Sequence, residues 1–276
     1  MENLTARVIA SMNYLGSTGE RPAYFTEARD RTHAMKLEPR DVPVVNFRDS
    51  QDQVKLSTTG CELINHRSKV TDFNSEEQLQ KIYAPEIQEL MGTVTGAAKI
   101  HVTPPILRWS ERELHPATVN SRPGRVVHVD YTRHSFHEFA QKHVDGDLDR
   151  KRLITGRYAV FNIWRVVSPP PQDCPLALID RRTTNKDDVV EGDVVTKSEG
   201  APEFRIGTSF YTWNPRHRWG YFRGMTRDEV LVFLAYDSAD DALPGTPHSA
   251  FDDPTCPADA PPRASCELRA YVYWGA

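Results

Sequence analysis

A histidine and an aspartate stand two positions apart in a short run of β-branched residues, at His128 and Asp130. Side chains of a β-strand alternate between its two faces, so these two groups project from the same face. Imidazole and carboxylate groups bind divalent metals, and with a second histidine they form the 2-His-1-carboxylate site typical of non-haem Fe(II) oxygenases. The pair therefore predicts two of the three protein ligands of a metal centre.

The same spacing occurs a second time, at His143 and Asp145. His143 ends a stretch of helical periodicity and leads into a glycine turn, where the two side chains need not share a face. His128 and Asp130 instead have apolar, β-branched neighbours. We therefore favour His128 and Asp130 as the metal ligands.

The third ligand must be a later histidine, and His248 and His217 are the candidates. His248 follows the apolar run 229–236 and precedes the last β-type run of the chain. His217 lies in a turn-like sequence just before Trp219, where it can equally be a turn histidine or a substrate contact. We predict His248 as the ligand and keep His217 as the alternative.

A second group of chemically useful residues opens the last β-type run. Arg263 and Ser265 occupy alternate positions there and are expected on one face of the strand. A guanidinium group binds a carboxylate through two parallel hydrogen bonds, and a hydroxyl can add another. This pair predicts a site for the far carboxylate of a dicarboxylic acid, with Arg269 as a second candidate for that role.

The elements that must position these residues read mainly as strands between loops, because 20 prolines and 15 glycines interrupt the chain. An amphipathic helix is expected at 75–91, with Pro85 at a kink, and 204–213 and 219–222 are expected to pair as a hairpin. Strands without alternating helices favour a jelly roll over a doubly wound sheet. We predict one mainly β domain over 1–276, with an N-terminal arm at 1–43 and flanking helices.

Composition excludes several other classes of protein. The chain has 276 residues with a net charge of −4 and interspersed signs, which argues against nucleic acid as the main partner. It has no apolar window long enough for a membrane span and no secretory signal, so we expect a cytoplasmic protein. Four scattered cysteines form no Cys-x-x-Cys pair, and the glycine motifs of serine hydrolases and dinucleotide-binding proteins do not occur.

Several longer blocks also occur in a fixed order along the chain. They are His128-Val-Asp130-Tyr-Thr, Asn162-Ile-Trp164-Arg165, Asn214-Pro-Arg-His217-Arg218-Trp219, Asp228-Glu229-Val-Leu-Val-Phe, His248-Ser-Ala-Phe251 and Pro262-Arg263-x-Ser265-x-Glu267-x-Arg269. Over roughly residues 44–274 the chain resembles the hydroxylase/desaturase family that includes a gibberellin desaturase and an aspergillic acid pathway hydroxylase. The resemblance implies a double-stranded β-helix and an Fe(II)/2-oxoglutarate-dependent dioxygenase of secondary metabolism.

The resemblance also implies roles for residues of this chain. His128, Asp130 and His248 would hold Fe(II), Arg263 and Ser265 would bind 2-oxoglutarate, and O2 would be the remaining co-substrate. Asn162 and Arg269 are further candidates for cofactor binding. The candidates for contact with a small-molecule substrate are Trp164, Arg165, Tyr211, Trp213, His217 and Tyr131, with Trp219 beside them.

Two alternative functions stay open at this point. A non-catalytic jelly-roll module could bind a small molecule or a non-redox metal, and 2-oxoglutarate would then have no effect on metal binding. An oxygenase could also use Fe(II) without 2-oxoglutarate, although the Arg263 and Ser265 pair argues against it. The sequence leaves open the substrate, the oligomeric state and the choice between hydroxylation, desaturation and oxidative cyclisation.

Overall fold

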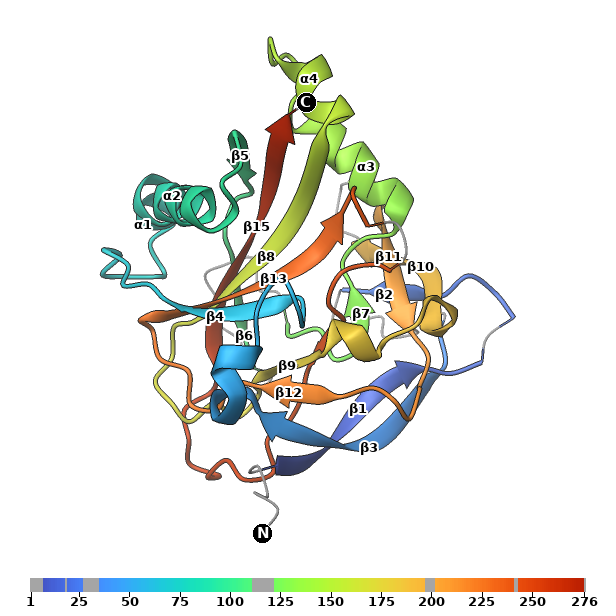
Figure 1. Ribbon diagram of the computed structural model, residues 1–276. Helices are drawn as coiled ribbons and strands as arrows, with labels where there is room; N and C mark the ends of the chain where they lie inside the picture. The colour runs from blue at the N-terminus through green and yellow to red at the C-terminus, as the bar shows by residue number, and fades with distance from the viewer. Residues whose placement is uncertain are drawn as a thin grey trace.

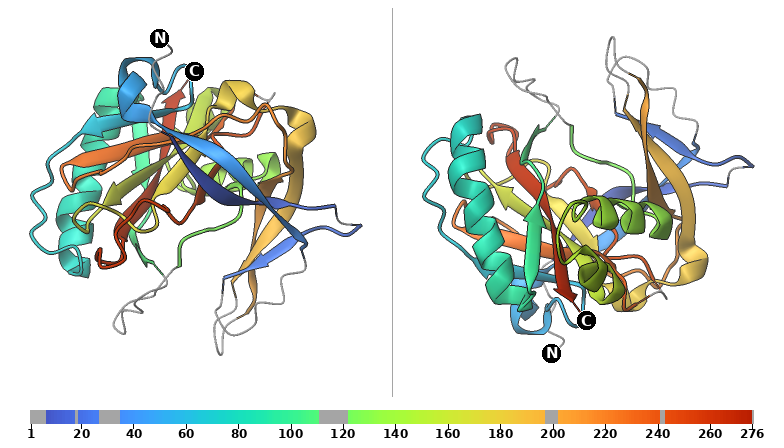
Figure 2. Two further views of the ribbon diagram at one scale, coloured as in Figure 1. Left: turned by 90° about the horizontal axis from the view of Figure 1, so that it is seen from below. Right: turned by 90° about the horizontal axis from the view of Figure 1, so that it is seen from above.

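Two β-sheets facing each other form the centre of the molecule, and the helices lie outside them (Figures 1 and 2). The computed structural model describes residues 7–17, 19–26, 35–110, 122–196, 202–240 and 243–275. This arrangement confirms the predicted jelly roll with flanking helices. None of the described helices is long and apolar enough to cross a membrane.

The larger sheet has nine strands and contains both of the predicted histidine ligands. In spatial order its strands are β1 (Arg7–Leu15), β3 (Leu37–Asn46), β12 (Trp219–Tyr221), β9 (Leu176–Ile179), β14 (His248–Ala250), β7 (His128–Val129), β11 (Phe204–Tyr211), β10 (Val189–Thr196) and β2 (Ala23–Phe25). Residues 1–43, expected as an N-terminal arm, therefore supply β1, β2 and the greater part of β3. Strand β1 alternates exposed and buried residues, which anchors this segment in the sheet.

The smaller sheet has six strands and carries the arginines of the last β-type run. Its strands follow the order β4 (Cys61–Asn65), β13 (Glu229–Asp237), β8 (Arg157–Val166), β15 (Ala264–Gly275) and β5 (Lys99–Val102), with β6 (Ile106–Trp109) also pairing with β15. Strands β8, β13 and β15 lie side by side in Figure 1 and are the long central strands of this sheet. Their length lets one end support the outer helices while the other end lines the interior.

The amphipathic helix predicted at 75–91 is present but is built from three consecutive pieces. These are α1 (Glu76–Gln78), a π-helical turn (Leu79–Tyr83) and α2 (Ala84–Thr95). The wider π turn comes directly before Pro85, which has no backbone N–H to donate and whose ring would clash with the preceding turn. Helices α3 (Arg133–Lys142) and α4 (Arg150–Thr155) follow β7, and three short 3-10 helices occupy Phe47–Gln53, Arg181–Thr183 and Lys186–Asp188.

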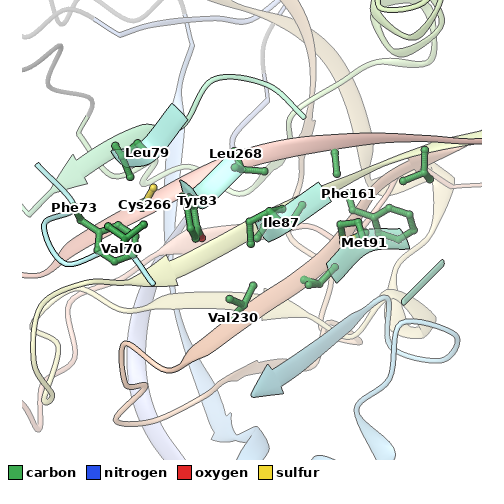
Figure 3. Close-up of a cluster of buried hydrophobic side chains, with 14 of the residues drawn as sticks. Val70, Phe73, Leu79, Tyr83, Ile87, Met91, Phe161, Val230, Cys266 and Leu268 are labelled. Carbon is green, nitrogen blue, oxygen red and sulfur yellow. The ribbon is translucent and has the colours of Figure 1, made fainter. Parts of the chain in front are cut away.

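Each face of the smaller sheet buries a different hydrophobic cluster. On β8, Phe161 and Ile163 pack outward against α2, in the cluster drawn in Figure 3. Trp164 and Val166 belong to a second cluster that includes Leu178 of the larger sheet. The alternation along β8 therefore joins α2 to one face and the larger sheet to the other, and each fully buried large side chain contributes roughly 1.5–3 kcal/mol.

Two expectations about strands differ from the structure. The predicted hairpin is wrong, because β11 pairs with β10 and β7 whereas β12 pairs with β3 and β9. The short run of β-branched residues around His128 and Asp130 reads as a strand over 126–131, but only His128 and Val129 form β7, and Thr132 already caps α3. Strand partners depend on tertiary packing, which local periodicity does not encode.

A glycine fixes the segment that leads into β14. The Gly245 N–H donates to the Ala235 carbonyl at 3.0 Å, and the Thr246 hydroxyl donates to the Gly60 carbonyl at 2.8 Å. A Cβ atom on Gly245 would lie 2.2 Å from the Leu234 carbonyl oxygen and 2.4 Å from the Ala235 carbonyl carbon. Only glycine allows this approach of backbone to backbone, and the contact lies just before His248.

Replacing Gly245 should therefore weaken both the fold and the metal centre. We expect Gly245→Ala to lower the free energy of unfolding by about 1–3 kcal/mol, measured by urea denaturation, because rigid backbone atoms must move apart. Fe(II) affinity should fall in the same variant as the segment before His248 shifts. Gly19→Ala is the control, since nothing lies within 4 Å of its added methyl group, and equal unfolding midpoints for the two variants would contradict the prediction.

Candidate metal centre

The two histidine ligands face each other across neighbouring strands. His128 on β7 and His248 on β14 are register partners in an antiparallel pair, and their ring centroids are 4.4 Å apart. Residues directly opposite each other in such a pair project from the same face of the sheet. The pairing of these short strands therefore brings together two imidazoles that are 120 positions apart in the sequence.

Backbone carbonyls fix which nitrogen of each imidazole is available. The Nδ1 atom of His128 lies 2.7 Å from the Val126 carbonyl oxygen, and Nδ1 of His248 lies 3.1 Å from that of Thr246. A carbonyl oxygen only accepts hydrogen bonds, so each Nδ1 carries a proton, and Nε2 is the nitrogen that the neutral ring can offer to a metal. Burial, followed by the charge of His128, lowers the pKa of His248 to about 4, so this ring is neutral near pH 7.

Asp130 completes the group from the end of β7. Its Oδ1 atom lies 3.6 Å from Nε2 of His128, and the possible ligand atoms of the three residues all lie within 4.8 Å of one another. Within the described part of the chain, this is the one cluster of at least three His, Cys, Asp or Glu side chains with metal-binding spacing. Two imidazoles and a carboxylate beside a cavity form a donor set that suits Fe(II).

The smaller sheet holds the Asp130 carboxylate in place. Asn162 donates from Nδ2 to Oδ2 at 2.6 Å, and Nη2 of Arg269 lies 3.2 Å from Oδ1. These two residues are register partners on β8 and β15. Burial alone would raise the pKa of Asp130, but the charge of Arg269 is the largest opposing effect, and the pKa of this carboxyl lies well below its usual value.

A cavity with about 600 Å³ of empty space, counted to its open mouth, connects the three ligands with Arg263, and we call it the inner cavity. The Arg263 side chain is 1% exposed, and its Nη1 donates to the Ser265 hydroxyl at 2.9 Å. Its Nε and Nη2 atoms are buried and find no hydrogen-bond partner among the described residues. An arginine stays charged even where burial lowers its pKa, so this unsatisfied edge of the guanidinium fits a carboxylate supplied from outside the chain.

The polar residues from Arg263 into β15 alternate along one face of the chain. Arg263, Glu267 and Arg269 all line the inner cavity, and Ser265 stands between them in the same alternation. Glu267 forms an ion pair with Arg108 of β6, and neither residue was predicted as part of the site. The spacing of two residues that identified Arg263 and Ser265 extends to Glu267 and could have identified it as well.

His217 belongs to a separate buried cluster. Its Nε2 lies 3.1 Å from Oδ2 of Asp188, its Nδ1 lies 3.0 Å from the Tyr14 hydroxyl, and that hydroxyl accepts from Nε1 of Trp219 at 2.8 Å. Both ring nitrogens are therefore engaged in hydrogen bonds. The cluster lies among buried side chains of the larger sheet, and this placement separates His217 and Trp219 from the metal centre.

The other predicted substrate contacts fall at different depths. The Tyr131 hydroxyl shares a hydrogen bond with the Tyr271 hydroxyl at 2.6 Å, and its ring lies under the Arg269 guanidinium. Tyr131 therefore packs behind the arginine that pairs with Asp130. Trp213 is 40% exposed and stacks with Arg40. Tyr211 is fully buried in the cluster of the larger sheet. None of the three lines the inner cavity.

Trp164 and Arg165 show why neighbouring positions on one strand have different roles. Trp164 lines the inner cavity, with the Arg263 guanidinium 5.5 Å from its ring centroid. Arg165 is fully buried on the opposite face of β8, where it donates to the carbonyls of His66 and Arg227, to Nδ1 of His66 and to the Tyr83 hydroxyl. It joins the segments before α1 and before β13, away from the cavity.

Comparisons with known proteins agree with this geometry. A family model described as "Oxidoreductase/YMDC permease-like domain" matches residues 12–273. The chain is 30% identical to the hydroxylase/desaturase CTB9 of Cercospora beticola, over 87% of this chain and 78% of the relative. It is 29% identical to the Fe(II)/2-oxoglutarate-dependent dioxygenase nvfI of Aspergillus novofumigatus, over 86% and 84%.

A solved structure is similar over nearly the whole chain. It is that of the iron and alpha-ketoglutarate-dependent endoperoxidase NvfI, with a TM-score of 0.80 and 25% sequence identity. The likeness covers 98% of this chain and 99% of that structure. The two-sheet architecture is therefore shared along the full length.

Removing the two competing histidines should separate their roles. We expect His248→Ala to lower Fe(II) affinity by more than the roughly 10–100-fold that loss of a supporting partner causes, measured by anaerobic titration. His217→Ala should keep its Fe(II) affinity but lose about 1–3 kcal/mol of stability, because Asp188 and Tyr14 lose a buried partner. Loss of Fe(II) binding in His217→Ala alone would make His217 the ligand instead.

Arg165 should act on stability and not on the metal centre. We expect Arg165→Met to lower the free energy of unfolding by about 2–5 kcal/mol, because two partly buried carbonyls and an imidazole nitrogen lose their donor. The folded fraction should bind Fe(II) as the wild type does. Arg67→Met, at an exposed position of the same segment, is the control, and unchanged stability of Arg165→Met would refute this structural role.

Proposed function

This chain belongs to the hydroxylase/desaturase family of Fe(II)/2-oxoglutarate-dependent dioxygenases, and from that membership we propose the part that each of its own residues plays. Fe(II), 2-oxoglutarate and O2 are the cofactor and co-substrates of such an enzyme. The observation that carries the assignment is the half-satisfied Arg263 guanidinium at the far end of the cavity that begins at His128, Asp130 and His248.

His128, Asp130 and His248 would hold the iron in our proposal. When bound, Fe(II) with 2-oxoglutarate and O2 supplies the oxidation: 2-oxoglutarate becomes succinate and CO2 while a C–H bond of the substrate is oxidised. Backbone carbonyls hold the Nδ1 protons of the two histidines, so Nε2 is the atom of each neutral ring that would bind the iron. Asn162 and Arg269 keep the Asp130 carboxylate charged and turned toward these nitrogens.

Arg263 and Ser265 would bind the far carboxylate of 2-oxoglutarate. The free Nε and Nη2 atoms form the side of a guanidinium that pairs with both oxygens of a carboxylate. The Ser265 hydroxyl accepts a hydrogen bond from Nη1 and so fixes the guanidinium plane. It can donate its own proton to the same carboxylate of 2-oxoglutarate. Trp164 would lie along the carbon chain of 2-oxoglutarate and exclude water from this part of the inner cavity.

The substrate in this proposal is a small molecule, a secondary-metabolite intermediate with an unactivated C–H bond to be hydroxylated, desaturated or cyclised. The names of the relatives, hydroxylase/desaturase and endoperoxidase, support this range of oxidations. We propose that residues 1–276 act as one oxygenase domain in the cytoplasm, where a reducing environment suits the four free cysteines. The alternative of a non-catalytic binding module lacks the support that the oxygenase has.

The function can be tested by adding Fe(II) and then 2-oxoglutarate to the purified protein without O2. A visible charge-transfer band should appear, and it should be absent in Asp130→Ala, which lacks a ligand. Admitting O2 should then release succinate, measured by chromatography. A wild-type protein that binds Fe(II) but gives neither the band nor succinate would contradict the proposed function.

Arg263→Met tests the co-substrate site separately. We expect 2-oxoglutarate affinity to fall by about 10–100-fold, the effect of losing a charge-assisted pair, while Fe(II) affinity is kept. Without 2-oxoglutarate this variant should be at least as stable as the wild type, because an unpaired buried charge has been removed. Arg182→Met, at an exposed arginine paired with Asp180, is the control, and unchanged 2-oxoglutarate affinity in Arg263→Met would overturn the assignment.

A further inference from the structure

A second cavity, which we call the outer cavity, shares part of its lining with the inner one. His128 and Asp130 line both cavities, and so does Gly124, which comes four residues before His128. The two spaces therefore meet beside the His128 ring. A molecule in the outer cavity would lie next to the metal centre while 2-oxoglutarate occupies the inner cavity.

The face of the larger sheet that carries the two histidine ligands continues into the outer cavity. Phe210 of β11 stands opposite His128 of β7, which in turn stands opposite His248 of β14. Side chains directly opposite each other on paired strands project from the same face. Phe210 also lines the outer cavity, so the surface beneath a molecule bound there leads without interruption to the imidazoles.

A second row of side chains makes this surface apolar. Ile206 of β11 stands opposite Val194 of β10, and Val194 stands opposite Tyr24 of β2, on neighbouring strands in Figure 1. All three line the outer cavity, and together with Phe210 we call them the sheet floor. The hydroxyl of Thr208, which lies between them, is 3.3 Å from two backbone carbonyl oxygens. The sheet floor therefore binds an apolar skeleton by burial of its surface.

Gly124 lies beside the His128 ring, where the two cavities meet. A Cβ atom at this position would be 3.0 Å from Cε1 of His128 and 3.7 Å from Nε2, the nitrogen that would bind the iron. Gly124 is not among the glycines with a positive φ, so its backbone conformation is open to other residues. The effect of the glycine is therefore to leave the space beside Nε2 without a side chain, and we call this space the gap.

The backbone around the gap is fixed by hydrogen bonds on both sides. The Gly124 carbonyl accepts from the Ala250 N–H at 2.8 Å, and the Asn13 side chain donates to the Arg125 carbonyl at 2.9 Å. The His128 ring is held as well, because its Nδ1 lies 2.7 Å from a backbone carbonyl oxygen. A methyl group at Gly124 would therefore fill the gap, since its neighbours have little freedom to move away.

We propose that Gly124 sets the size of the substrate group that reaches the metal centre, while the rest of an apolar substrate lies on the sheet floor. The inference rests on the proposed function, because the group admitted beside Nε2 is the one whose C–H bond is oxidised. The gap admits a branched carbon, whereas an alanine in its place would admit only a slender group. Shape is thus selected at Gly124 and apolar area on the sheet floor.

Two hydrocarbons can probe the gap, because neither has a polar atom that could bind the metal. Toluene and tert-butylbenzene share a ring and differ in the width of the alkyl group. The protein is loaded with saturating 2-oxoglutarate and with Co(II), a paramagnetic ion that accepts imidazole and carboxylate ligands, and Zn(II) gives the diamagnetic reference. NMR titration reports affinity, and Co(II)-dependent relaxation reports which protons lie near the metal. In the wild type we expect the tert-butyl protons to relax faster than the ring protons.

Two variants test the gap and the sheet floor separately. Gly124→Ala should weaken tert-butylbenzene about tenfold by overpacking and leave toluene unchanged. Ile206→Thr keeps a β-branched side chain and should weaken both probes about fourfold, the worth of one buried methylene group. The controls are Gly19→Ala, with nothing within 4 Å of its added methyl group, and Ile9→Thr, at a position of β1 that is 56% exposed. Both should bind the probes as the wild type does.

The outcomes separate this proposal from the function on which it rests. A wild type that lacks the charge-transfer band with Fe(II) and 2-oxoglutarate refutes the oxygenase itself. With the band present, equal weakening of the two probes by Gly124→Ala would overturn the size limit. So would a folded Gly124→Ala that no longer binds Co(II), because the glycine would then serve only to place His128.

The wild type and Ile206→Thr decide the proposal even if Gly124→Ala does not fold. Tert-butyl protons that Co(II) relaxes no faster than the ring protons would show that this group does not enter the gap, and the proposal would fail. Equal affinity of Ile206→Thr and Ile9→Thr for the two probes would exclude the sheet floor as the binding surface.

Discussion

The hydrogen-bonded contact between Asp130 and the pair Asn162 and Arg269 joins the two sheets at the metal centre. Asp130 comes from the larger sheet, and its two partners stand opposite each other on β8 and β15 of the smaller one. A buried carboxylate is costly unless it is paired and hydrogen-bonded. The Arg269 guanidinium and the Asn162 amide offset this cost by pairing with the carboxylate. They also set its orientation relative to the two imidazoles.

Side-chain alternation explains which parts of the site could be read from the sequence. His128 with Asp130, and Arg263 with Ser265, are each two positions apart on one strand, and the structure places each pair together. The pairing of β7 with β14, which brings His248 opposite His128, is a tertiary register that no local pattern encodes. The wrong hairpin has the same origin, because β11 and β12 found partners far away in the sequence.

The different surroundings of His248 and His217 show what distinguishes a candidate metal ligand from a structural histidine. His248 and His217 are both buried and both stand near an aspartate, so residue type and burial do not separate them. His217 uses both ring nitrogens within a buried network. His248 uses Nδ1 on a carbonyl and directs Nε2 at a cavity that it shares with two other donors. Arg165 and Arg263 differ in the same way. The guanidinium of Arg165 donates hydrogen bonds to protein acceptors, whereas Nε and Nη2 of Arg263 find no acceptor among the described residues.

The cavity that Val194 and Ile206 line takes this apolar wall from the larger sheet, whereas Arg263 and Ser265 lie at the start of β15 in the smaller sheet, and this separation has a consequence for how the enzyme can diversify. Substitutions in β2, β10 or β11 would reshape the surface around Val194 and Ile206 without changing Arg263 or Ser265. A lineage, or a laboratory selection, can thus explore new molecular shapes at one end of the larger sheet while His128, Asp130, His248 and Arg263 are inherited intact. Selectivity and reactivity become separable traits within a single fold.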